Sequence, residues 1–318
     1  MTDIRSRKGD HIALAMNSNH QSKAKSSFDL IHFEHNPMPE LALGDINLTA
    51  SFLGGTVSAP FIIGAMTGGC ENGETINQRL AEAAEQCNIP MALGSQRASL
   101  ELNLEQNIRR WAPTAIILGN LGATQLQQKG IDLALRAVES VHANALIIHL
   151  NPLQELIQPN GDRDWRFILE AIRNCCRILT VPVIIKEVGS GISPSAAIKL
   201  VEAGVSGIEL AGRGGTSWAS IEMERNSSDR DRQVAQPFLD WGTDTTVLLN
   251  QFNQLDLCTQ IIGSGGVRHG LDIARCIRLG ADMGALAQPF LQPALTSTDA
   301  VIEKIDILSE QLLSLIHI

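Results

Sequence analysis

The chain has 318 residues, of which 44% are hydrophobic and 19% are charged, which is enough apolar surface for a large core and excludes an intrinsically disordered chain. Its formal net charge of −9 argues against a general surface for nucleic acid or an anionic membrane, while it still allows a local basic pocket. No apolar run reaches the ~18 residues that span a bilayer, and the first residues lack the features of a signal peptide. We therefore expect a cytoplasmic protein that binds neither nucleic acid nor membrane.

After residue 55 the chain alternates between short apolar runs and amphipathic segments. In chain order, the runs are 60–66, 90–95, 114–120, 145–151, 182–188, 206–212, 260–266 and 283–290. Because these runs are continuously apolar rather than alternating, they predict parallel strands that are covered on both faces.

Amphipathic segments between the runs predict helices. Residues 163–180 have helical periodicity, and 193–204 carries Ser193 as N-cap, Pro194 at the first helical position and Gly204 at its end. Eight strand–helix units predict a (β/α)8 TIM barrel. A doubly wound sheet is the competing fold, but no GxGxxG motif follows the first run.

Two stretches depart from this alternation within a single domain that spans 1–318. Residues 1–55 are expected to cover the bottom of the barrel and to send an arm over its top. Residues 213–243 form a long insertion after the sixth run, which predicts a mobile, lid-like element. Its charged middle, from Glu222 to Arg232, is expected to be solvated.

The carboxyl ends of the strands hold the active site in such a barrel, so polar residues and glycines there are the informative ones. Gly265 and Gly266 follow the seventh run, and Ala287 and Gln288 follow the eighth. Backbone N–H groups can approach a phosphate closely where no Cβ intervenes, so these residues predict a phosphate site. The alternative is that the two glycines serve only a tight turn.

Lys186 ends the fifth run and is either a snorkelling surface lysine or a buried cation that faces an anionic ligand, such as the edge of a flavin ring. We favour the ligand role. Four of the candidate residues lie in the segment HLNPLQE, in which His149 and Asn151 share one face of a strand and Gln154 and Glu155 follow. A histidine at a strand end is often only a hydrogen-bonded core residue.

A glutamate beside a phosphate group is best explained as a Mg²⁺ ligand, because a bare carboxylate repels phosphate. This reading applies to Glu155. Positive charge for the phosphate could come from Arg7, Lys8, His11 and Arg97. The alternative for the first three is a solvated polar tail.

Seven motifs together resemble the flavin-dependent type 2 isopentenyl diphosphate isomerases. They are RKGDH (7–11), MTGG (66–69), GSQR (94–97), HLNPLQE (149–155), KEVG (186–189), GGTSW (214–218) and SGGVR (264–268). They follow the family's order over almost the whole chain. HLNPLQE with the RK start is specific to this family, whereas SGG and KEVG are shared with other FMN barrels. Gln288 departs from the pattern, where arginine or leucine is more common, although a backbone contact would tolerate it.

This resemblance implies conversion of isopentenyl diphosphate to dimethylallyl diphosphate with reduced FMN and Mg²⁺, NADPH as reductant, and a homo-oligomer, commonly a tetramer or octamer. It implies FMN contacts from Ala65, Met66, Thr67, Ser95, Asn120, Lys186, Thr216, Gly265, Gly266, Val267, Ala287 and Gln288. It implies substrate contacts from Arg7, Lys8, His11, Ser95, Gln96, Arg97, His149, Asn151 and Gln154. Gln154 would lie by the alkene as the residue assigned to catalysis, and Glu155 would bind Mg²⁺.

The chemistry of moving a double bond agrees with this resemblance. An unactivated alkene needs a strong acid beside an apolar carbon, yet tyrosine is absent from the chain and none of the six cysteines forms a CxxC pair. A reduced flavin can supply the acid and base function itself. An FMN-dependent α-hydroxy-acid oxidase is a competing function, but that chemistry favours tyrosine hydroxyls. A non-enzymatic phosphate-binding barrel is another, but it would not explain Gln154 and Glu155 together with a basic arm.

Overall fold

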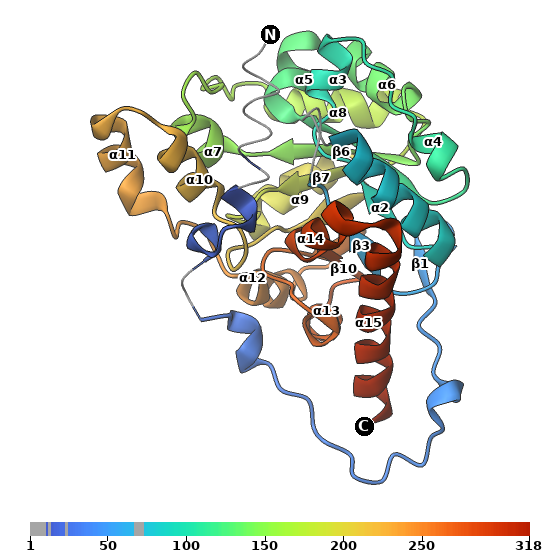
Figure 1. Ribbon diagram of the computed structural model, residues 1–318. Helices are drawn as coiled ribbons and strands as arrows, with labels where there is room; N and C mark the ends of the chain where they lie inside the picture. The colour runs from blue at the N-terminus through green and yellow to red at the C-terminus, as the bar shows by residue number, and fades with distance from the viewer. Residues whose placement is uncertain (1–10, 12–13, 23–24, 67–72) are drawn as a thin grey trace.

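The computed structural model describes residues 11, 14–22, 25–66 and 73–318 (Figure 1). Eight parallel strands close into a barrel in the order β10-β3-β4-β5-β6-β7-β8-β9, so the predicted TIM barrel is confirmed. The strands are β3 (Phe61–Ile63), β4 (Met91–Ala92), β5 (Ile117–Gly122), β6 (Ala145–Leu150), β7 (Val183–Glu187), β8 (Gly207–Glu209), β9 (Gln260–Gly263) and β10 (Met283–Leu286). Each lies within or overlaps one of the predicted apolar runs.

Helices surround the barrel and bury its outer face (Figure 1). They are α2 (Gly73–Cys87), α3 (Arg97–Glu101), α4 (Ile108–Trp111), α5 (Ala123–Lys129), α6 (Ile131–Glu139), α7 (Pro152–Ile157), α8 (Ile168–Ile178), α9 (Pro194–Glu202), α10 (Trp218–Arg225), α11 (Asp229–Ala235), α12 (Thr245–Phe252), α13 (Gly270–Arg278), α14 (Gln288–Thr296) and α15 (Thr298–His317). Helix α9 begins as predicted, since Ser193 Oγ accepts a hydrogen bond from Ala196 N. Gly204 follows it with a φ of +98°, a conformation that suits glycine.

The inside of the barrel is apolar near its amino-terminal end. A hairpin of β1 (Ala50–Phe52) and β2 (Gly55–Val57) packs there, and Phe52 and Val57 are fully buried. They share a cluster with inward-facing strand residues such as Ile62, Leu118 and Ile184. The N-terminal region therefore fills one end of the barrel and leaves the carboxyl end open for a site.

An arm of the N-terminal region lies over the carboxyl end, against the insertion after β8. The arm contains the 3-10 helix η1 (Ser18–His20). Three further 3-10 helices are η2 (Ser27–Leu30) and η3 (Leu43–Asp45), which precede β1, and η4 (Gln236–Phe238), which follows α11. Ser22 N donates to Gly215 O over 2.8 Å, and His20 Nε2 lies 2.8 Å from Glu224 Oε2. The chain then loops away from the barrel, below α13 and α15, before it enters β1 (Figure 1).

The insertion contains the two helices α10 and α11, and α10 packs against α7. The expectation that its charged middle is solvated is wrong at Glu222, whose side chain is fully buried. Helix α10 turns Glu222 toward α7 and the arm, where polar partners satisfy its carboxylate. No helix among the described residues is long and apolar enough to cross a membrane.

Candidate active site

A cavity of about 670 Å³ opens at the carboxyl end of the barrel. It gathers most of the residues that the sequence analysis assigned to one site. Those that line it are His11, Ala65, Met66, Ser95, Arg97, Asn120, His149, Asn151, Gln154, Glu155, Lys186, Thr216, Gly265, Gly266, Val267, Ala287 and Gln288. Arg7, Lys8 and Thr67 lie outside the described residues, so their placement stays a prediction.

Gln96 does not line this cavity, and its side chain is turned away from the place where a substrate contact was expected. The side chain is 1% exposed and turns toward α6, where Gln96 Nε2 donates to Ala137 O over 3.1 Å. Its Oε1 accepts a hydrogen bond from Asn120 N over 2.8 Å. Gln96 therefore holds strand β5 against α6 behind the barrel wall, although its neighbours Ser95 and Arg97 face the cavity.

Inward-facing polar residues form one level of the barrel at the floor of this cavity. Strand register pairs His149 with Lys186, and Lys186 with Glu209, on neighbouring strands. Asn120 joins this level from β5, because His149 Nδ1 lies 2.8 Å from Asn120 Oδ1. The apolar level beneath holds Ile184 on the same strand as Lys186. Because every second residue of a strand faces inward, the level above the apolar one is formed by these polar residues, and it is the floor of the cavity.

The loop between β9 and α13 forms a cradle at one side of the cavity. Gly265 has a φ of +97°, and a Cβ there would collide with the backbone oxygen of Gly212. The backbone N–H groups of Gly265, Gly266 and Val267 donate to no acceptor among the described residues. Three free donors in a loop without side-chain bulk suit a phosphate group. The first residues of α14 lie beside this loop and line the same cavity.

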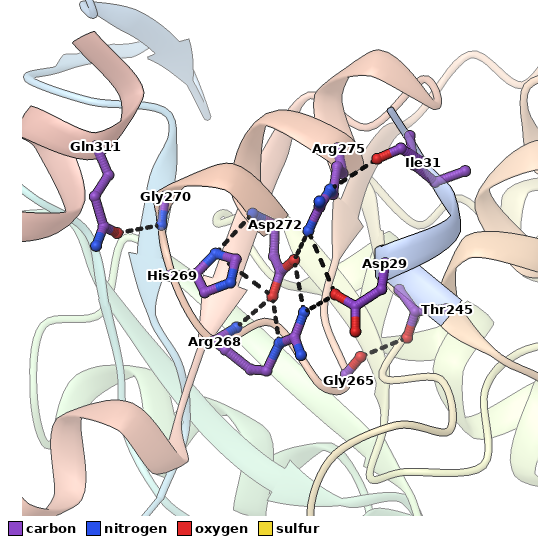
Figure 2. Close-up of polar contacts among 10 residues, drawn as sticks. All are labelled: Asp29, Ile31, Thr245, Gly265, Arg268, His269, Gly270, Asp272, Arg275 and Gln311. Carbon is purple, nitrogen blue, oxygen red and sulfur yellow. Dashed lines mark hydrogen bonds and ion pairs between the residues drawn. The ribbon is translucent and has the colours of Figure 1, made fainter. Parts of the chain in front are cut away.

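Side chains around the cradle hold its loop in place (Figure 2). Thr245 Oγ1 donates to Gly265 O over 2.7 Å, and Arg268 Nε donates to Asp272 Oδ2 over 2.8 Å. Arg268 also reaches Asp29 of the N-terminal region, whose Oδ1 lies 2.7 Å from Arg268 Nη2. The hydrogen bond from Arg268 lowers the pKa of Asp29. Arg268 therefore joins the cradle directly to the N-terminal region.

Replacing Asp272 by alanine is expected to lower the free energy of unfolding by about 1.5–3 kcal/mol, as for lost hydrogen bonds between charged groups. Asp272 is fully buried and accepts from both Arg268 and Arg275. Urea unfolding followed by circular dichroism measures the change. Asp29→Asn is the matched control: it keeps the shape of an exposed partner of the same arginine and is expected to change stability little. An equal loss in both variants would contradict this difference.

The segment after β6 places three of the expected site residues on the opposite side of the cavity. Asn151 Nδ2 donates to Gln154 Oε1 over 3.2 Å and to Glu155 Oε1 over 3.1 Å. Glu155 Oε2 accepts from Asp162 N over 2.8 Å. These bonds follow from helix α7, in which Asn151 is the N-cap residue and Pro152 begins the first turn. The amide and the carboxylate are thus held in one orientation at the cavity wall.

Glu222 is a site residue that the sequence analysis missed. Its Oε1 accepts a hydrogen bond from Gln154 Nε2 over 3.0 Å and lies 2.9 Å from His11 Nε2. Arg225 Nη1 donates to Glu222 Oε2 over 2.8 Å. Burial alone raises the pKa of Glu222, but the hydrogen bond and charge of His11, with Gln154 and Arg225, lower it overall. An ionised Glu222 therefore anchors Gln154 to both the insertion and the arm.

Among the described residues, no group of three or more His, Cys, Asp or Glu side chains is arranged to hold a metal ion. Mg²⁺ commonly keeps waters and binds one or two carboxylates together with substrate phosphates, so a single carboxylate at a cavity wall can contribute to such a site. Glu155 is 7% exposed and lines the cavity with one side of its carboxylate held by backbone. Arg97, one third exposed, lies at the same cavity and can face an anion.

Comparisons with known proteins show which families this chain is similar to. Residues 154–317 match the model of a family described as FMN-dependent dehydrogenase. A curated isopentenyl-diphosphate delta-isomerase of Cronobacter sakazakii is 44% identical and covers 98% of this chain and 91% of its own. Those of Pseudescherichia vulneris and Halobacterium salinarum are 45% and 43% identical, over 96% and 97% of this chain and 90% and 88% of theirs.

Solved structures with the same fold are more distant in sequence. A flavocytochrome b2 variant with sulfite bound has a TM-score of 0.70 at 20% identity, and covers 96% of this chain and 77% of its own. An (S)-mandelate dehydrogenase mutant has a TM-score of 0.69 at 18% identity, over 99% and 93% of the two chains. At this level of identity, the likeness shows the barrel fold alone.

Proposed function

The chain belongs to the flavin-dependent, type 2 family of isopentenyl-diphosphate delta-isomerases, and on this basis we propose that it interconverts isopentenyl diphosphate and dimethylallyl diphosphate by proton addition and elimination, with reduced FMN and Mg²⁺. One observation carries the proposal. A single cavity has a phosphate cradle at one side and the cluster of Asn151, Gln154 and Glu155 at the other. A cofactor phosphate and a substrate diphosphate can therefore bind at separate places around one reacting centre.

The residues of the cradle and the floor fit FMN. The free N–H groups of Gly265, Gly266 and Val267, beside Ala287 and Gln288 at the start of α14, would hold its phosphate. Its ring would lie over Asn120 and Lys186, with Ala65, Met66, Ser95 and Thr216 around it, and Thr67 completes the set by resemblance. In its reduced state, bound FMN would supply the acid and base function that moving a double bond requires.

Basic side chains that FMN would not contact are left to bind the substrate. Arg97, His149 and His11 would contact the diphosphate, with Arg7 and Lys8 expected to join them from the arm. His149 is held by Asn120, which fixes the ring that faces the cavity. Glu155 would bind Mg²⁺ between protein and diphosphate, because a divalent cation removes the repulsion between the two anions.

Gln154 would lie closest to the alkene. Its Nε2 is committed to Glu222 and its Oε1 to Asn151, so the amide plane has one orientation. An amide has no titratable proton near neutral pH, so its role is to position or to relay a proton. Glu222 acts on this step through Gln154 and through His11.

Glu155→Gln is expected to weaken the binding of Mg²⁺ while FMN stays bound, since the change keeps the shape and removes a ligand charge. Titration of Mg²⁺ in the isomerase assay measures the half-saturating concentration, which should rise. Glu101→Gln is a control, because Glu101 is an ion-pair partner of Arg97 and does not line the cavity. An unchanged half-saturating concentration in Glu155→Gln would show that Glu155 is not a Mg²⁺ ligand.

The competing hydroxy-acid oxidase is tested by the visible spectrum of the FMN-loaded protein. Anaerobic addition of NADPH should bleach the flavin, whereas lactate or mandelate should not. Bleaching by a 2-hydroxy acid would contradict the isomerase assignment in favour of the oxidase. A protein that binds no FMN at all would favour a barrel that only binds phosphate ligands.

We further propose a cytoplasmic homo-oligomer, a tetramer or octamer. The segment from the end of η2 to β1 presents large apolar side chains to solvent, with Leu30 and Met38 each 76% exposed. Exposed apolar side chains concentrated on one segment suit burial against another copy. Light scattering on the purified protein measures the molar mass, and a monomer at micromolar concentration would contradict this part of the proposal.

A further inference from the structure

Glu209 is a buried carboxylate in the floor of the cavity that the proposed reaction does not use. It ends strand β8 and is the register partner of Lys186 on the neighbouring strand β7, and its side chain is 3% exposed. Glu209 Oε1 lies 3.6 Å from Lys186 Nζ, whose side chain is 13% exposed. Both residues line the cavity over which the FMN ring would lie.

Few groups hold the ammonium of Lys186 in place. Lys186 Nζ donates to the backbone oxygen of Glu187, and Glu209 is its carboxylate partner among the described residues. The carboxylate of Glu187 is committed elsewhere, because its Oε2 accepts from the backbone N–H groups of the loop 188–191. An ammonium has three donors. With two of them directed at Glu187 O and Glu209, the third is left for a ligand above the floor.

The pair also sets the charge that the floor presents. Lys186 alone would place a full positive charge beneath the cavity, in a site where water screens it little. A carboxylate at 3.6 Å balances much of that charge. The neighbouring groups at the same level, His149 and Asn120, are bonded to each other and add no second carboxylate.

We propose that Glu209 is a positioning residue that orients Lys186 and balances its charge, so that the two together set the reduction potential of the bound FMN. This inference rests on the proposed place of the ring over Lys186. Reduction adds electron density to the ring, so positive charge beneath it favours the reduced form and negative charge opposes it. Lys186 alone would stabilise the reduced ring strongly and lower the affinity of that ring for a proton. Glu209 would reduce both effects.

The reduction potential of FMN in the loaded protein tests this, measured by equilibration with a reference dye. Glu209→Gln keeps the size of the side chain and removes its charge. The equilibrium constant for reduction is expected to rise at least tenfold, which is about 30 mV for a two-electron couple. Lys186→Met is expected to shift the potential in the opposite direction. A potential in Glu209→Gln that is unchanged or lower than that of the parent protein would overturn the inference.

Two further variants complete the test. The double variant of Glu209→Gln and Lys186→Met leaves no lone charge in the barrel and is expected to have a potential above that of Lys186→Met alone. It therefore decides the question where Glu209→Gln alone does not fold. A double variant at or below Lys186→Met would overturn the inference. Asp282→Asn removes one negative charge at the exposed, amino-terminal end of the barrel. It should leave the potential unchanged, and a shift as large as that of Glu209→Gln would count against a local pair.

Failure of this inference is distinguishable from failure of the proposed function. A parent protein that binds no FMN would contradict the proposed function. An FMN-loaded protein whose potential follows Lys186 but not Glu209 would contradict the inference alone.

Discussion

Replacing Gln154 by asparagine is expected to lower kcat by about 100-fold, because a shift of ~1 Å at a reacting centre can cost that much. The substitution keeps the amide and shortens its reach by one methylene group. The shorter side chain can no longer meet both Asn151 and Glu222 from its place on α7. KM for the diphosphate should change little, since that affinity depends on basic residues such as Arg97. FMN content should be unchanged, because the cradle lies on the other side of the cavity.

Steady-state kinetics at several Mg²⁺ concentrations distinguish this role from a purely structural one. If Gln154 only packed the loop that carries Glu155, high Mg²⁺ would restore most of kcat, and that recovery would refute a direct role. Gln158→Asn is a matched control on the same segment. Gln158 donates to Glu155 Oε2 over 3.5 Å, whereas the bond to Glu222 comes from Gln154. Its kcat should stay within a few-fold of the parent value at saturating Mg²⁺.

Gly265→Ala is expected to abolish tight FMN binding, with a loss of at least roughly 100-fold in affinity. A left-handed backbone conformation costs an alanine about 1–2 kcal/mol. The added Cβ would also collide with the backbone of Gly212, so the loop that presents the three free N–H groups must move. Fluorescence titration of FMN into the apoprotein measures the dissociation constant.

Gly54→Ala is the matched control for that experiment. Gly54 also has a positive φ, +78°, but nothing lies within 4 Å of a Cβ there. It belongs to the hairpin turn at the opposite end of the barrel. We expect Gly54→Ala to lower stability slightly and to leave FMN affinity unchanged. Normal FMN affinity in Gly265→Ala would show that the cradle does not hold the phosphate.

The fold follows from local patterns that the sequence displays. Each of the eight strands lies within or overlaps a mainly apolar run of the sequence, and Ser193 with Pro194 marks the start of α9. The carboxyl ends of parallel strands converge by geometry, so residues as distant as Ser95 and Gln288 could be assigned to one site. These predictions need only periodicity and topology.

The errors arise where tertiary contacts decide the direction of a side chain. Gln96 lies between two cavity residues in the sequence, yet the turn into α3 sends its amide toward α6. Glu222 stands in a charged stretch that is typical of a solvated helix, and only its contacts with Gln154 and His11 reveal its place. Glu209 had a usable signal, because a charged residue in an apolar run is unusual and the period of two places it on the inward face with Gly207.

The central claim is that the chain isomerises isopentenyl diphosphate only when its FMN is reduced. The direct measurement is anaerobic incubation of the FMN-loaded protein with Mg²⁺ and isopentenyl diphosphate, with and without NADPH, followed by product analysis. Dimethylallyl diphosphate should accumulate after the flavin is bleached and not before. Turnover at full rate under air with no reductant at any stage, or no product from the fully reduced protein, would contradict the claim.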